Sequence, residues 1–211
     1  MKSAALARLR GIYPLADDDP RWRNDPKAVI EGALAGGASA VQLRLKHTAD
    51  GDALTLARWA AERARAAGAL FVVNDRFDLA DLAGADGVHL GQRDLPPERI
   101  PDELRARLLI GLSTHTLAQV RESRARPVDY IGFGPVFGTK SLESAWGSRG
   151  TAMLAEAVGL AERPVVAIGG IDLANAAEIT RAGAAAAAVI SAIADAPDPA
   201  AATRALAGEL A

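Results

Sequence analysis

The stretch VQLRLK alternates aliphatic and polar side chains. Successive side chains of a strand point to opposite faces, so Gln42, Arg44 and Lys46 would share one face. If that face is buried, an unpaired cation on it is costly, and an arginine beside a lysine therefore needs an anion. Phosphate or diphosphate suits both cations. A buried salt bridge to Asp75 or Asp94 is the structural alternative, and the two arrangements can coexist.

Two carboxylates, Asp75 and Asp94, follow the apolar runs LFVVN and GVHLG. Magnesium is usually held by one or two carboxylates together with phosphate oxygens of a substrate. Each aspartate could instead cap the helix that follows it, because Asp is favoured at that position. Arg44 and Lys46 favour the metal site, since these cations and a metal would together neutralise a diphosphate.

A second anion site is indicated by the segments AIGG and VISAI near the end of the chain. Gly169 and Gly170 would let the backbone approach an anion closely, and Ser191 adds a hydroxyl. Glycine pairs are common in turns. The prediction therefore depends on their position, because the last two strands of a barrel often carry a phosphate site built from backbone N–H groups.

The chain contains three histidines. His115, in the sequence STH, could transfer protons near neutral pH, or it could cap the helix that follows. His89 lies within an apolar run and is expected to pack or to hydrogen-bond a ligand, and His47 is expected at a rim or in a loop.

These polar residues lie at the ends of apolar runs that alternate with helix-like segments. Such alternation predicts parallel strands joined by helical crossovers and buried on both faces. The expected strands are 11–17, 40–46, 70–75, 87–92, 108–115, 130–137, 164–170 and 186–193. The expected helices are 26–36, 52–67, 77–83, 100–107, 116–125, 150–162, 172–182 and 197–210.

Eight such units predict an α/β fold, a single (β/α)8 TIM barrel that forms one domain over residues 1–211. A doubly wound open sheet is the alternative. It would more often have five or six units and a glycine-rich first turn, which the first turn here lacks.

The composition narrows the class of protein. A net charge of −2 argues against a nucleic-acid-binding protein, which usually carries a basic excess. The chain has no cysteine, so disulfides and cysteine-bound metals are excluded. Arginines interrupt the first residues before any secretory apolar core, and the alanine-rich run near the end is too short to span a bilayer. We expect a cytoplasmic protein with small-molecule substrates and without membrane or nucleic-acid partners; a homo-oligomer remains open.

With these residues assembled, the chain resembles the thiamine-phosphate synthase family over nearly its whole length. The segments that carry the resemblance are VQLRLK, VVNDRFDLA, ADGVHLGQRD, IGLSTHTLAQV, DYIGFGPVFGT, PVVAIGGI and AAVISAI. The resemblance implies a transferase that joins hydroxymethylpyrimidine diphosphate to thiazole phosphate and yields thiamine phosphate and diphosphate. The implied reaction is a dissociative displacement assisted by Mg2+.

The resemblance also implies roles for individual residues. Those that would bind the pyrimidine diphosphate are Gln42, Arg44, Lys46, Asn74 and Ser113. Three of these, Arg44, Lys46 and Ser113, would act in catalysis. The ligands of Mg2+ would be Asp75 and Asp94. Those that would bind the thiazole phosphate are Thr139, Lys140, Ser141, Gly170, Ile190 and Ser191.

The loop GPVFGTKSLESAWGSRG departs from the family pattern. The family typically reads Phe-x-Thr-x-Thr/Ser-Lys, and this lysine contacts the diphosphate. Aligned from Phe137, the present chain has Leu142 at the lysine position and Lys140 two residues earlier. Losing one charged contact to a leaving group would cost about 2–4 kcal/mol of transition-state stabilisation. We therefore expect lower synthase activity unless Lys140 or Arg149 replaces the contact.

Two other functions stay open from the sequence. The chain also resembles the sister family of thiazole tautomerases in its GSRG segment, and His115 would be the acid–base of such an enzyme. A non-catalytic barrel that binds a thiamine precursor is the third reading, motivated by Leu142. Asp75 and Asp94 favour the synthase over both.

Overall fold

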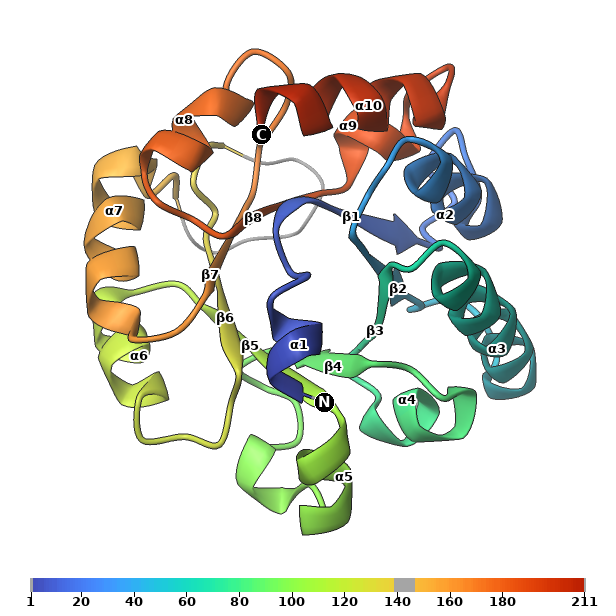
Figure 1. Ribbon diagram of the computed structural model, residues 1–211, viewed down its shortest axis with the longest axis horizontal. Coiled ribbons are helices and arrows are strands. Elements are labelled where there is room, and N and C mark those ends of the chain that lie inside the picture. Colours follow the sequence, from blue (N-terminus) through green and yellow to red (C-terminus); the bar gives the residue numbers. More distant parts are fainter. Residues whose placement is uncertain (1, 139–146, 211) are drawn as a thin grey trace.

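The computed structural model describes residues 2–138 and 147–210, which form a closed barrel of eight parallel strands (Figure 1). The strands are β1 (Gly11–Asp17), β2 (Ala40–Arg44), β3 (Leu70–Asn74), β4 (Gly87–Leu90), β5 (Leu109–Thr114), β6 (Tyr130–Phe133), β7 (Val165–Ile168) and β8 (Ala186–Val189). They follow one another in chain order, and β8 pairs with β1 to close the ring. The predicted (β/α)8 TIM barrel is confirmed.

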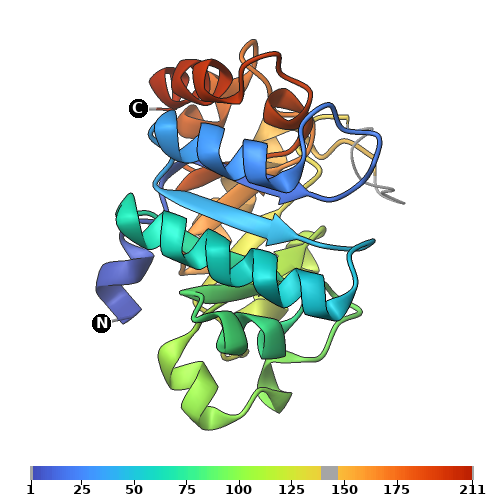
Figure 2. The ribbon, with the colours of Figure 1, turned by 90° about the vertical axis from the view of Figure 1, so that its right-hand side faces the viewer.

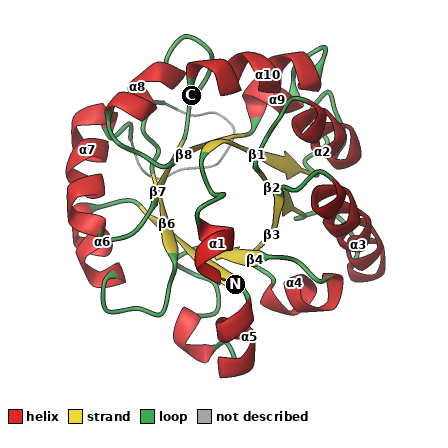
Figure 3. Ribbon diagram, viewed as in Figure 1, coloured by secondary structure: helices red, strands yellow, loops and turns green. Residues whose placement is uncertain are grey.

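The helices lie outside the barrel, most of them in a layer around its wall (Figure 3). They are α1 (Lys2–Leu6), α2 (Pro26–Ala35), α3 (Asp50–Ala66), α4 (Phe77–Ala83), α5 (Asp102–Arg107), α6 (Leu117–Ser123), α7 (Gly150–Ala161), α8 (Ala176–Arg181), α9 (Ser191–Ala194) and α10 (Pro199–Glu209), with a 3-10 turn, η1, at Pro97–Arg99. The side view shows α2 and α3 lying along the barrel wall (Figure 2). No helix in the described part of the chain combines the length and apolarity needed to cross a membrane.

Local sequence signals explain where several helices begin. The side chain of Asp25 accepts a hydrogen bond from the backbone N–H of Ala28 at 2.8 Å, and Pro26 occupies the first position of α2. An N-cap aspartate followed by proline satisfies a free N–H group and fixes the backbone angle that the helix needs. Asp198 and Pro199 repeat this arrangement at α10.

The structure differs from the sequence prediction mainly at strand ends. Several predicted strands extend past the last paired residue, because the chain leaves the ladder there to start a loop or helix. The clearest case is the predicted strand 186–193, which ends at Val189 and continues into the short helix α9. The sequence also gave no sign of α1, which lies across the opening of the barrel at the amino ends of the strands (Figure 1). Lys2 holds it there through an ion pair with Asp129, 2.8 Å between Nζ and Oδ2.

The barrel interior combines large polar-tipped side chains with small neighbours. Tyr13 and Tyr130 are fully buried, and His89 packs against Tyr130 with ring centroids 5.5 Å apart. Gly111 makes room for this pair, since a Cβ atom at its position would lie 2.2 Å from Tyr130 Cζ and 2.4 Å from His89 Nδ1. The polar tips of these rings therefore reach the centre of the barrel beneath its carboxyl end.

Candidate active site

A small cavity lies inside the barrel toward the carboxyl ends of the strands. It has a volume of about 80 Å³. Four of the five residues predicted to bind the pyrimidine diphosphate line it, namely Gln42, Arg44, Asn74 and Ser113. Arg44 and Asn74 are the last residues of β2 and β3, and Ser113 is the next to last of β5. The strand ends therefore bring together residues that are far apart in the sequence.

Arg44 forms an ion pair with Asp17, whose side chain is only 1% exposed. Asp17 also accepts a hydrogen bond from the indole Nε1 of Trp22 at 3.1 Å. Asp75 and Asp94 were the predicted alternative partners for the cations of the VQLRLK segment, and for Arg44 this prediction was wrong. The physical reason is register: Asp17 and Arg44 are direct partners on the neighbouring strands β1 and β2.

Lys46 lies beyond the end of β2, not on the strand face where its spacing had placed it. Its Nζ forms an ion pair with Asp75, as the salt-bridge alternative allowed. The loop that carries Lys46 is fastened by Asp18, which accepts hydrogen bonds from the N–H groups of Lys46, His47 and Thr48 at 2.8–2.9 Å. Burial alone would raise the pKa of Asp18, but the hydrogen bonds from Lys46, Thr48 and His47 outweigh it and hold the pKa below its ordinary value.

Asp75 and Asp94 do not cap helices. The N-cap of α4 is Arg76, and the Asp94 carboxylate instead accepts a hydrogen bond from the backbone N–H of Gly91 at 2.6 Å. Asp75 has a φ of 62°, in the left-handed region that residues other than glycine seldom adopt. Such strain is characteristic of functional positions. The predicted helix-capping alternative therefore does not explain either aspartate.

The two carboxyl groups interact with each other, and their pKa values shift in opposite directions. Burial and the neighbouring Asp94 raise the pKa of Asp75 against the attraction of Lys46. Burial also opposes ionisation of Asp94, but hydrogen bonds from Asp75 and Gly91 outweigh it and lower the pKa of Asp94. Adjacent carboxylates that cannot both ionise easily offer a natural place for a divalent cation.

A chain of buried hydrogen bonds crosses the barrel beneath this cluster. Gln42 Nε2 donates to the Tyr13 hydroxyl at 2.9 Å, and that hydroxyl lies 3.4 Å from the hydroxyl of Tyr130. The Tyr130 hydroxyl lies 3.1 Å from Nδ1 of His89, and Nε2 of His89 lies 3.0 Å from Oγ of Ser113. Burial lowers the pKa of His89 to about 4 despite the nearby negative charge of Asp94, so the ring is neutral at pH 7. Neither tyrosine was predicted as a site residue, because both lie within apolar runs of the sequence.

His115 lies at the end of β5 and faces the loop after β6. Its Nδ1 donates to the backbone carbonyl of Gly134 at 2.8 Å, and its backbone N–H donates to the Gln119 side chain at 2.7 Å. The N-cap of α6 is Thr116, whose hydroxyl accepts from the N–H of Gln119. The prediction that His115 caps the helix was therefore wrong, and its side chain helps to hold the β6 loop.

The residues predicted to bind the thiazole phosphate are only partly described. Gly170 follows β7, and Ile190 and Ser191 join β8 to α9. Gly170 has a φ of 68°, and a Cβ atom there would lie 2.3 Å from the carbonyl oxygen of Gly138. Close packing of the β6 and β7 loops thus requires this glycine. Thr139, Lys140 and Ser141, together with Leu142, lie outside the described residues.

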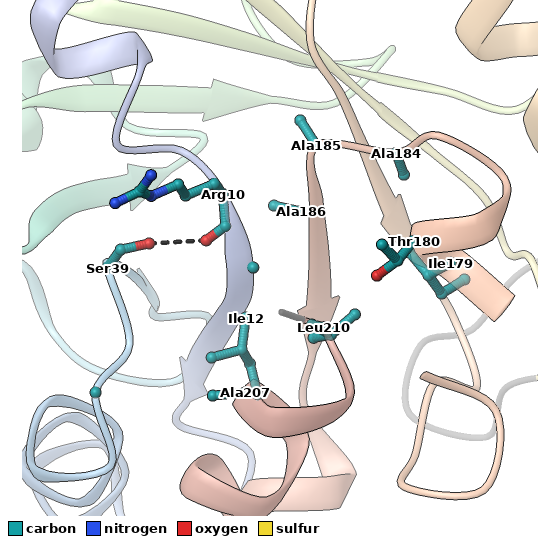
Figure 4. Close-up of a pocket in the computed structure, with 12 residues that line it drawn as sticks. Arg10, Ile12, Ser39, Ile179, Thr180, Ala184, Ala185, Ala186, Ala207 and Leu210 are labelled. Carbon is teal, nitrogen blue, oxygen red and sulfur yellow. Dashed lines mark hydrogen bonds between the residues drawn. The ribbon is translucent and has the colours of Figure 1, made fainter. Parts of the chain in front are cut away.

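A second cavity, of about 490 Å³, lies at the opposite end of the barrel (Figure 4). It is lined by the first residues of β1 and β8, Gly11 and Ala186, by Ala207 of α10 and by Leu210, which follows that helix. The hydroxyl of Ser39 donates to the backbone carbonyl of Arg10 beside it (Figure 4). None of the predicted site residues lines this cavity, so the larger space is not the candidate active site.

Comparisons with known proteins show which family this chain resembles. The profile of a family described as thiamine monophosphate synthase matches residues 12–193. Thiamine-phosphate synthase of Anaeromyxobacter dehalogenans (strain 2CP-C) is 45% identical over 196 residues, which cover 93% of this chain and 86% of that protein. Its counterpart in Roseiflexus sp. (strain RS-1) is 42% identical over 195 residues, 92% of this chain and 83% of that protein.

A solved structure is also similar to this barrel. Thiamine phosphate pyrophosphorylase from Pyrococcus furiosus superposes with a TM-score of 0.87 at 35% identity and covers 97% of both chains. The profile match, the two relatives and this structure all extend over most of the barrel. The chain belongs to the thiamine monophosphate synthase family.

Proposed function

We propose that this chain is a thiamine-phosphate synthase, a transferase that joins hydroxymethylpyrimidine diphosphate to thiazole phosphate. The observation that carries the proposal is the cluster of Arg44, Lys46, Asp75 and Asp94 at neighbouring strand ends, above a cavity lined by Gln42 and Ser113. The names of the relatives support the same reaction. Cations and carboxylates beside a small cavity suit a reaction in which a diphosphate leaves the methylene carbon of a pyrimidine.

The charges of the cluster fit Mg2+. Arg44 and Lys46 face three carboxylates, those of Asp17, Asp75 and Asp94, so full ionisation would leave one negative charge in excess. Such a cluster would repel a diphosphate unless a divalent cation joined it. Asp75 and Asp94 would hold the ion, which would neutralise the leaving diphosphate.

The side chains of the cluster supply positioning and charge, and none of them has to act as a nucleophile. Arg44, Lys46 and Ser113 would hold the diphosphate as the bond between the pyrimidine methylene carbon and the diphosphate oxygen breaks. The electron pair leaves with the diphosphate, and the thiazole nitrogen then donates its lone pair to the methylene carbocation. Fixed charges and close approach of the two substrates stabilise this path. Asn74 would contact the pyrimidine diphosphate.

The second substrate would lie toward β7 and β8. Gly170, Ile190 and Ser191 would bind the phosphate of the thiazole, together with Thr139, Lys140 and Ser141 of the β6 loop. The closeness of the loops after β6 and β7 supports a shared site, since Phe137 N–H donates to Gly169 O at 2.9 Å.

The test is an assay of purified protein with pyrimidine diphosphate, thiazole phosphate and MgCl2. Thiamine phosphate should form, and Asp75→Ala should abolish it, whereas the control Asp78→Ala, at an exposed aspartate of α4, should retain it. Thiazole isomerisation without product, lost in His115→Ala, would refute the synthase in favour of a tautomerase. Binding of the substrates without either reaction would favour the non-catalytic barrel.

Other properties stay predictions from the sequence. These are the single domain over residues 1–211, the cytoplasmic location and the lack of nucleic-acid and membrane partners. The oligomeric state stays open.

A further inference from the structure

We propose that Tyr13, Tyr130 and His89 are positioning residues that link Gln42 to Ser113. Through them, the amide group that Gln42 presents to a ligand, oxygen or NH2, determines whether the Ser113 hydroxyl can donate a hydrogen bond to that ligand. We call the five side chains Gln42, Tyr13, Tyr130, His89 and Ser113 the polar chain. The proposal rests on the proposed function for the identity of the ligand. It concerns how the site distinguishes an aminopyrimidine from the corresponding pyrimidinone.

The contacts of the polar chain fix one direction of donation. Gln42 Nε2 can only donate, so the Tyr13 oxygen accepts and its hydrogen is directed to Tyr130. The Tyr130 oxygen accepts that hydrogen and directs its own to Nδ1 of His89. An imidazole that accepts at Nδ1 carries its hydrogen on Nε2 and donates it to Ser113. Any mixed order would leave a buried donor or acceptor without a partner, which is costly.

The two ends of the polar chain both reach the cavity. Gln42 is 2% exposed, and its Oε1 has no hydrogen-bond partner among the described residues. This oxygen is therefore an acceptor that a ligand N–H group can satisfy. Ser113, which already accepts from His89, has its hydroxyl hydrogen available for a ligand acceptor.

A diphosphate oxygen can only accept, so it requires Ser113 to donate. Through the polar chain, a donating Ser113 requires Gln42 to present Oε1, the acceptor, to the ring. An aminopyrimidine offers an exocyclic N–H donor there. The pyrimidinone, with oxygen in place of the amino group, offers an acceptor instead.

Binding the pyrimidinone would require the Gln42 amide to rotate by half a turn. Tyr13 would then donate to Gln42, Tyr130 to Tyr13, and His89 from Nδ1 to Tyr130. Nε2 of His89 would accept, and the Ser113 hydroxyl would donate to it and no longer to the diphosphate. An acceptor in place of the amino group on the ring therefore removes the hydrogen bond from Ser113 to the diphosphate.

The experiment compares the dissociation constants of aminopyrimidine diphosphate and pyrimidinone diphosphate, with MgCl2 and without thiazole phosphate. We expect the wild type to prefer the aminopyrimidine by roughly 100-fold or more, since sites that hydrogen-bond a ligand reject analogues that lack the match. Tyr130→Phe should reduce this ratio at least about tenfold, because Gln42 and Tyr13 can then reorient without affecting Ser113. A loss of stability alone would weaken both ligands equally and leave the ratio unchanged.

Two further variants complete the design. Tyr13→Phe breaks another link and should reduce the ratio by itself, and the double variant should add little, because both changes interrupt one unit. Thr114→Val is the matched control. Thr114 is 1% exposed, and the change removes a hydroxyl that donates to Gly132 O at 2.8 Å, outside the polar chain. Its ratio should equal that of the wild type.

The outcomes separate this proposal from the proposed function. If the wild type makes thiamine phosphate but Tyr130→Phe and Tyr13→Phe keep its ratio of dissociation constants, only the coupling is overturned. A wild type that prefers the aminopyrimidine but makes no product would overturn the synthase, while the ratios still decide the coupling. A wild type that binds neither ring would overturn both.

Discussion

Replacing Asp75 with asparagine should stabilise the metal-free protein while it abolishes the proposed reaction. Asparagine keeps the shape of the side chain, and its amide can donate to Asp94 as the protonated carboxyl does. It also tolerates the left-handed backbone that Asp75 adopts. The change removes the charge that burial and Asp94 make unfavourable.

The expected gain follows from linkage. A carboxyl whose pKa is raised in the folded protein destabilises that state at neutral pH, by about 1.4 kcal/mol for each pKa unit. The variant also loses the ion pair with Lys46, whose side chain is 43% exposed, and such pairs contribute about 0–1 kcal/mol. We therefore expect a net gain of about 0.5–2 kcal/mol. For a chain of this size that corresponds to a rise in Tm of roughly 1–8 °C.

Thermal unfolding after removal of divalent ions would measure this gain. The native pKa of Asp75 lies above its unfolded value of about 3.9, so the penalty is absent at lower pH and develops as pH rises through the native pKa. The variant and the wild type should thus have similar Tm values near pH 3.5 and differ most at neutral pH. Adding MgCl2 with diphosphate should raise the Tm of the wild type alone.

A lower Tm for Asp75→Asn in metal-free buffer at pH 7 would refute the reasoning, as would an equal response of both proteins to MgCl2. Asp78→Asn provides the matched control. The hydrogen bonds and charge of Arg76 outweigh partial burial and lower the pKa of Asp78, so neutralising it should decrease Tm at neutral pH and leave turnover unchanged.

Three further changes test other parts of the site. Arg44→Ala leaves the buried Asp17 without its cation and should lower the free energy of unfolding, measured with urea, by about 3–5 kcal/mol. Adding Asp17→Asn to this variant should restore most of the lost stability. Asp18→Asn should lower the unfolding free energy at neutral pH, and this loss should shrink only as pH falls below the unfolded value of about 3.9 and through the depressed native pKa, because the native carboxylate stabilises the fold until it is protonated. Leu142→Lys should raise kcat roughly tenfold or more; an unchanged kcat would mean that another cation already contacts the diphosphate.

The fold was predictable, and so was the gathering of Gln42, Arg44, Asn74 and Ser113 around one cavity, because both depend on short-range patterns. Alternating apolar runs and helices specify the barrel, and period-two spacing placed Gln42 and Arg44 on one inward face. The partners of these residues were not predictable. The pairing of Asp17 with Arg44 depends on the register between β1 and β2, and the sequence of either strand alone does not specify that register. Tyr13 and Tyr130 resemble ordinary core residues until the closed barrel brings their hydroxyls together.

The hydrogen bonds of Asp18 have a consequence for protein engineering. Lys46 and the backbone around it are held by a residue that follows β1, and Arg44 is neutralised by the last residue of that same strand. A designer who transplanted only VQLRLK into another barrel would obtain a loop of undefined shape and an unbalanced guanidinium. The smallest transferable unit is β1 and β2 together with Asp18, which directly follows β1 and completes the ADD tripeptide of residues 16–18.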